Sequence, residues 1–98
     1  MEISIKFIWL YALSNEINEE IYVGISDNPD RRIIEHNKGK NRYTKAFMPW
    51  SPFYYARYND YSNARVAEKY YKRSNNKKKL KVFLEKWRQT GEVTVVMN

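Results

Sequence analysis

The chain has 98 residues, a length that supports one domain over residues 1–98 with a single modest core. Aromatic residues make up 16% of it, which argues against disorder, and the absence of cysteine excludes a disulfide scaffold, thiolate catalysis and a Cys-ligated zinc site. The net charge of +7 indicates an anionic partner. No stretch approaches the ~20 apolar residues of a membrane span, and signal-peptide features are lacking, so we expect a cytoplasmic protein.

Two apolar segments near the start of the chain predict an antiparallel hairpin. Residues 5–13 and 20–25 are rich in aliphatic and aromatic side chains, and the polar residues 14–18 are expected to form the turn between them. Gly24 lies inside the second of these strands. A glycine at such a position indicates a backbone that another group approaches closely.

A helix is predicted to start at residues 28–30, which read Asn-Pro-Asp. The asparagine can cap the helix, proline suits its first position, and the aspartate complements its positive end. We expect this helix to direct Ile33 and Ile34 into the core and to end near Gly39.

The second half of the chain predicts one more strand and two more helices. Residues 40–52 are expected to form a basic, aromatic loop, followed by a strand at residues 53–58. Ser62 resembles the cap of a helix that continues past Tyr71, a break is predicted at residues 75–76, and a last helix ends near residues 90–91. Residues 93–97 could add an edge strand. The predicted fold class is α+β, with a three-stranded antiparallel sheet flanked by about three helices, and Trp50 and Trp87 are expected in its core.

Basic residues are concentrated in one part of the chain. Residues 38–81 contain thirteen Lys or Arg but only two acids, Asp60 and Glu68, and aromatic residues are interleaved with the bases. This pattern favours a face that binds nucleic-acid phosphates over a merely solvated charged surface, and an anionic membrane is less consistent because no helix has a clean apolar face. The candidate nucleic-acid-binding residues are Lys40, Arg42, Tyr43, Lys45, Lys69, Lys72, Arg73, Lys77, Lys78 and Lys79.

A few residues have the chemistry that phosphodiester hydrolysis needs. Tyr11 and Tyr22 can lie near each other on one face of the hairpin, and Arg32 and His36 are four residues apart on one helix face. Glu68 is a carboxylate among cations and could hold a hard divalent cation. Each residue alone also has a structural explanation: strand tyrosines, a surface ion pair of Arg32, a capping histidine and a pairing of Glu68 with a lysine on its own helix.

Five sites follow the order and spacing of a known nuclease family. Trp9-Leu10-Tyr11 precedes Tyr22-Val23-Gly24 by ten residues, Arg32 lies eight residues after the glycine, and His36 lies four further. Glu68 follows on the helix after the third strand. The set resembles the GIY-YIG endonucleases over about residues 8–84, with Trp-Leu-Tyr in place of Gly-Ile-Tyr. The intervening residues resemble a small stand-alone subgroup related to the nuclease domains of excision repair and branched-DNA resolution.

The resemblance implies a metal-dependent DNA endonuclease, structure-selective in DNA repair, recombination or defence. In that case Tyr11, Tyr22, Arg32, His36 and Glu68 would be catalytic, and Glu68 would bind Mg²⁺ or Mn²⁺. The expected partner is DNA and not a membrane, with a protein partner or self-association as a further means of targeting. The alternative is a non-catalytic or partner-dependent nucleic-acid-binding module on the same fold.

Overall fold

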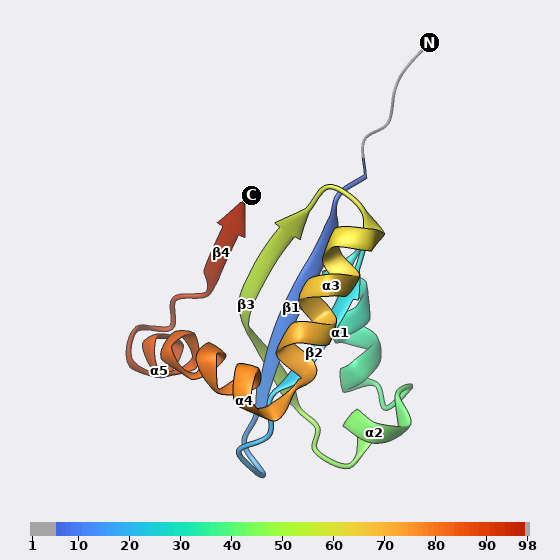
Figure 1. The fold of residues 1–98 in the computed structure, drawn as a ribbon. Coiled ribbons are helices and arrows are strands. Elements are labelled where there is room, and N and C mark those ends of the chain that lie inside the picture. Colours follow the sequence, from blue (N-terminus) through green and yellow to red (C-terminus); the bar gives the residue numbers. More distant parts are fainter. Residues whose placement is uncertain (1–5, 98) are drawn as a thin grey trace.

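The computed structural model describes residues 6–97, so the expected strand start at Ile5 lies outside the described residues. Figure 1 shows how its strands and helices are arranged. In order they are β1 (Ile8–Asn15), β2 (Tyr22–Ser26), α1 (Pro29–Asn37), α2 (Arg42–Lys45), β3 (Trp50–Tyr58), α3 (Tyr61–Lys72), α4 (Ser74–Lys77), the 3₁₀ turn η1 (Lys78–Leu80), α5 (Lys81–Thr90) and β4 (Thr94–Met97).

The sheet has the strand order β2-β1-β3-β4. The predicted β1–β2 hairpin is confirmed, and β3 pairs with the other side of β1, also antiparallel. The C-terminal tail adds β4 parallel to β3, so the antiparallel three-stranded sheet that we expected is part of a mixed four-stranded one. A parallel neighbour requires a crossover connection, and α3, α4 and α5 provide it. The α+β class is therefore confirmed.

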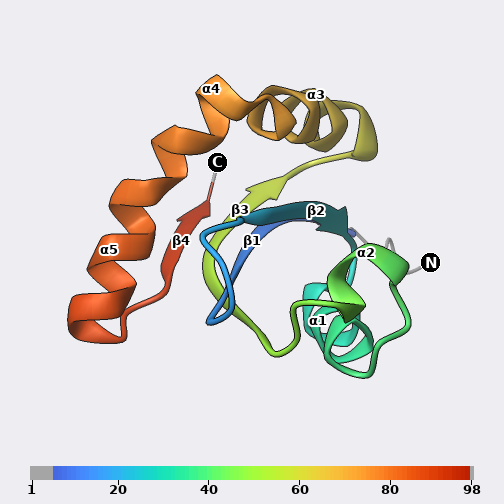
Figure 2. The ribbon, with the colours of Figure 1, turned by 90° about the horizontal axis from the view of Figure 1, so that it is seen from below.

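Helices cover both faces of this sheet (Figure 2). The short helices α1 and α2 lie on one face, and α3, α4 and α5 lie on the other. Side chains of β1 alternate between the two faces, as a strand requires. Leu10 and Ala12 belong to the core beneath α3 and α5, whereas Tyr11 and Leu13 belong to a second core with Ile33 and Trp50.

The helix ends differ in part from the prediction. The Asn28 side chain caps α1 by accepting from the Arg31 amide, as expected, but Ile34 is 54% exposed because only Ile33 lies on the buried face. The cap of α3 is Asp60 and not Ser62. The Asp60 side chain accepts a hydrogen bond from the Asn63 amide, and Asp60 lies just after the end of β3.

Three further segments correct the sequence-based boundaries. The expected loop at residues 40–52 contains the short helix α2, which Asn41 caps, and β3 begins at residue 50 rather than 53. The break after α3 falls at Arg73, whose backbone is extended, so residues 75–76 lie inside α4. Trp50 is buried as expected, but Trp87 is only partly buried at the rim of the core. Within residues 6–97, no helix has the length and apolar character needed to cross a membrane.

Candidate active site

Three buried side chains form a hydrogen-bonded row on the face of the sheet that α1 and α2 cover. The Tyr11 hydroxyl lies 3.1 Å from His36 Nε2, and His36 Nδ1 lies 2.9 Å from Thr44 Oγ1. None of the three is more than 1% exposed. They come from β1, α1 and α2, so elements separated along the chain together fix the imidazole ring.

Gly24 allows Tyr11 to occupy its position. The two residues are direct partners in the β1–β2 register, and the phenol ring lies over the Gly24 backbone. A Cβ atom at residue 24 would be 2.5 Å from the Tyr11 hydroxyl oxygen and 2.6 Å from Cζ. The close approach expected at this glycine is therefore confirmed, and the approaching group is Tyr11.

Arg32 lies at the outer end of the row. Its guanidinium forms a 2.6 Å ion pair with Glu35 and hydrogen-bonds to Tyr11. Burial and the neighbouring Tyr22 raise the pKa of Tyr11 to about 12, although the charge of Arg32 acts in the opposite direction. For Arg32 itself, burial alone would lower the pKa, but the bonds to Glu35 and Tyr11 raise it above its usual value. Tyr11 is therefore a protonated phenol at neutral pH, and Arg32 remains a cation.

His36 is a neutral imidazole under the same conditions. Burial, followed by the positive charge of Arg32, lowers its pKa below the usual value of 6.5. The ring also packs edge-on against Tyr22, with 4.6 Å between the ring centroids. Tyr22 is only partly buried and lines a surface cleft, so of the two tyrosines it is the one that faces solvent.

Glu68 lies on α3, on the other side of the edge strand β2 from α1 (Figure 2). Its side chain is 12% exposed and pairs with Lys72 at 3.2 Å and Arg65 at 3.8 Å. Its charge nevertheless contributes to raising the pKa of Tyr11, so the carboxylate acts on the same phenol as Arg32. Tyr11, Tyr22, Arg32 and His36 therefore lie together, and Glu68 acts on this group through its charge from the other side of β2.

The donor set suits a weakly held hard cation. Among residues 6–97 no group of three or more His, Asp or Glu side chains could enclose a metal ion. Mg²⁺ commonly binds through one or two carboxylates, keeps several waters and completes its shell with substrate phosphate. Glu68 offers carboxylate oxygens and pairs with Lys72, which lines the cleft at Tyr22, so the residues present fit that mode of binding.

The cleft at Tyr22 lies between two groups of predicted nucleic-acid-binding residues. It measures about 240 Å³ and is lined by Ile21, Tyr22, Val23, Tyr43, Lys72 and Lys77. Tyr43 comes from α2, whereas the two lysines come from α3 and α4. The first group comprises Lys40, Arg42, Tyr43 and Lys45, and the second comprises Lys69, Lys72, Arg73, Lys77, Lys78 and Lys79. Of these ten residues only Lys77 is partly buried, and the others are exposed.

Sequence reasoning overlooked the residues that support the site. Thr44 and Glu35 were not among the candidates, although each directly contacts a residue that was. Asn37 was also missed: its side chain bonds the Trp50 backbone at 2.6 and 2.9 Å and ties α1 to the start of β3. Glu35, Asn37 and Thr44 lie in segments that resemble the subgroup, Glu35-His36-Asn37 and Tyr43-Thr44-Lys45, but that resemblance assigns them no role.

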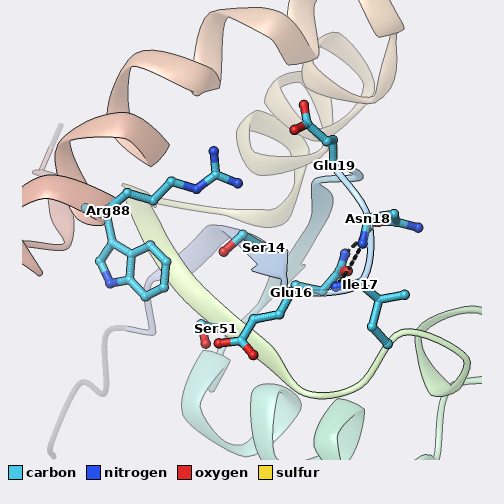
Figure 3. A pocket seen from close by; sticks show the side chains of 9 residues that line it. Ser14, Glu16, Ile17, Asn18, Glu19, Ser51 and Arg88 are labelled. Atoms are coloured by element: carbon cyan, nitrogen blue, oxygen red, sulfur yellow. Dashed lines mark hydrogen bonds between the residues drawn. The ribbon is translucent and has the colours of Figure 1, made fainter.

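A separate hollow lies at the β1–β2 turn (Figure 3). It measures about 460 Å³ and is bordered by Ser14, Asn15, Ser51, Trp87 and Arg88 together with the turn residues 16–19. Glu16 and Glu19 are carboxylates that repel phosphate, and none of the predicted site residues lines this hollow. This hollow is therefore less suited than the Tyr22 cleft to binding a phosphate.

Comparison with known proteins places the chain in a family. Residues 7–81 match the family model of the GIY-YIG catalytic domain. The chain is 36% identical to a UPF0213 protein of Bacillus cereus over 72 residues, which cover 72% of this chain and 70% of the relative. It is 32% identical to a UPF0213 protein of Bacillus licheniformis over 82 residues, covering 83% and 84%. No solved structure gives a significant match. The chain therefore belongs to the GIY-YIG family.

Proposed function

We propose that this protein is a metal-dependent DNA endonuclease. The observation that carries the proposal is the convergence of Tyr11, Tyr22, Arg32 and His36 on one edge of the sheet, where the Glu68 charge also acts. Basic residues lie on both sides of this place. A phosphodiester backbone held there would bring its scissile phosphate to the Arg32 guanidinium and the Glu68 carboxylate.

Each side chain has a role that suits its surroundings. Tyr22 lines the open cleft, so we assign it the orientation and activation of the attacking water. Arg32 stabilises the negative charge that develops on the phosphate, because a planar guanidinium matches phosphate geometry. Tyr11, which burial keeps protonated, holds Arg32 and His36 in place. Glu68 would hold the Mg²⁺ or Mn²⁺ ion, which neutralises charge on the scissile phosphate and its leaving oxygen when bound.

The two basic groups would position the DNA strand on either side of the scissile phosphate. Lysines and arginines that neutralise phosphates displace counterions, so binding should weaken steeply with salt. Tyr43 is 53% exposed at the border of the cleft, and it packs edge-on against Phe47 with 6.1 Å between the ring centroids. Exposed rings of this kind can stack on unpaired bases, which favours a structure-selective role in repair, recombination or defence.

The decisive experiment is cleavage of labelled single-stranded, flap and duplex DNA with Mg²⁺, Mn²⁺ or a chelator. Wild type is compared with Glu68→Ala, Tyr22→Phe and the control Glu85→Ala, which removes a carboxylate paired at the same i,i+3 spacing on α5. We expect metal-dependent cutting that is lost in Glu68→Ala, reduced in Tyr22→Phe and retained in the control. Salt-sensitive binding without cutting on any substrate would instead favour the non-catalytic or partner-dependent binding module.

A further inference from the structure

In the row of hydrogen bonds through His36, the groups at both ends determine which atom donates and which accepts. At the outer end, a guanidinium has only donors, so Arg32 must donate to the Tyr11 oxygen. The phenol proton then has to be donated elsewhere, and His36 Nε2 lies 3.1 Å away. Because Tyr11 is 1% exposed, solvent is a poor alternative acceptor. This end requires Nε2 of His36 to be unprotonated.

The inner end requires the same arrangement. The Thr44 hydroxyl donates to the Asn41 carbonyl oxygen, at 3.4 Å, and a carbonyl can only accept. The Thr44 oxygen is then free to accept a proton from His36 Nδ1, at 2.9 Å. The tautomer of a histidine follows from the hydrogen bond made by its other nitrogen. Both ends therefore place the single proton of the neutral imidazole on Nδ1.

Thr44 is held firmly enough to impose this choice. Its side chain is fully buried, its amide donates to the Asn41 side chain at 3.1 Å, and its carbonyl oxygen accepts from Trp50 Nε1 at 2.8 Å. The opposite tautomer would place a proton on Nε2, facing the phenol. The Tyr11 hydroxyl would then have to turn its own proton towards Arg32, and the guanidinium would lose the phenol oxygen as an acceptor and keep its bond to Glu35.

We infer that Thr44 is a positioning residue that fixes His36 in the Nδ1–H tautomer and thereby directs the row of hydrogen bonds that holds the Arg32 guanidinium. Thr44 lies too deep to touch DNA, yet it controls the group to which we assign stabilisation of the transition state. Only this catalytic consequence rests on the proposed nuclease function. The tautomer itself is a property of the folded protein.

The first experiment determines which imidazole nitrogen of His36 carries the proton, by long-range proton–nitrogen correlation NMR at neutral pH. The chain has one histidine, so the signals need no assignment. Wild type is compared with Thr44→Val, which keeps the shape without the hydroxyl, and Thr44→Ser, which keeps the hydroxyl. We expect an Nδ1–H imidazole in wild type and in Thr44→Ser, and a mixed or Nε2–H imidazole in Thr44→Val. An Nε2–H imidazole in wild type, or an unchanged tautomer in folded Thr44→Val, would overturn the inference.

Cleavage kinetics then test the link to Arg32. In Thr44→Val we expect kcat to fall by up to about a hundredfold with KM little changed, and Thr44→Ser to restore most of it. Equal kcat in folded Thr44→Val and wild type would refute the link, even if the tautomer changes. If wild type cuts no DNA, the proposed function fails, and the NMR result still decides the role of Thr44.

Discussion

Replacing Gly24 with alanine adds a single methyl group at the most crowded point of the site. The new Cβ would lie 2.5 Å from the Tyr11 hydroxyl oxygen, whereas ordinary contact begins at 3.4 Å. The phenol would have to move by roughly 1 Å to restore a normal van der Waals separation. Tyr11 is buried and bonded to His36, so there is little space into which it can move. Displacing the ring would also displace the partners that depend on it.

The expected cost has two parts. Overpacking of this kind destabilises a protein by about 1–3 kcal/mol, which urea unfolding of wild type and Gly24→Ala should show. Misplacement of a catalytic group by about an ångström can reduce the rate by about a hundredfold, which the DNA-cleavage assay should show at saturating substrate. The imidazole signals of His36 should shift as well, because its hydrogen bond to Tyr11 is strained.

Gly91→Ala is the matched control for Gly24→Ala. Gly91 has a φ of 74° but nothing within 4 Å of an added Cβ, so alanine there is strained only in its backbone. We expect a loss of about 1 kcal/mol in unfolding free energy without a change in the folded-state cleavage rate. If Gly24→Ala matched wild type in stability and in cleavage, the close packing of Tyr11 on residue 24 would not be a requirement of the site.

Three other outcomes follow from the same contacts. Arg32→Lys keeps the charge but loses the planar fork shared by Tyr11 and Glu35, so kcat should fall while DNA affinity changes little; equal kcat values would contradict the role of Arg32. Lys72→Ala and Lys77→Ala should each weaken DNA binding and reduce the slope of log affinity against log salt by about one, as measured by fluorescence anisotropy, and an unchanged slope would remove that lysine from the interface. The pKa of Tyr11 is raised from 10.0 to about 12, so its stabilising contribution is complete below pH 10 and lost as the pH rises towards 12. Urea unfolding should therefore show a fall in stability across that range that is smaller in Tyr11→Phe, and equal falls in both proteins would contradict the assignment.

Local patterns in the sequence were sufficient to predict most elements of the fold. Continuous runs of aliphatic and aromatic residues predicted β1 and β2, because a strand that packs between two helical layers needs apolar side chains on both faces. The Asn-Pro-Asp start of α1 was also read correctly, because a cap acts within one helical turn. Where two residues competed for one role, local reasoning failed: Ser62 and Asp60 can both cap a helix, and only the end of β3 decides between them.

The candidate site shows the same division. The order and spacing of Tyr11, Tyr22, Arg32, His36 and Glu68 indicated the family, because they resemble its motifs, and residues 7–81 match its model. Spacing along a strand or helix also determines which face a side chain occupies. Spacing alone does not determine whether a residue on that face is buried. The tertiary structure decided that Tyr11 is covered and protonated whereas Tyr22 lines the cleft. It also brought Thr44 to His36 from a segment expected to be a loop, a contact between separate elements that no local pattern encodes.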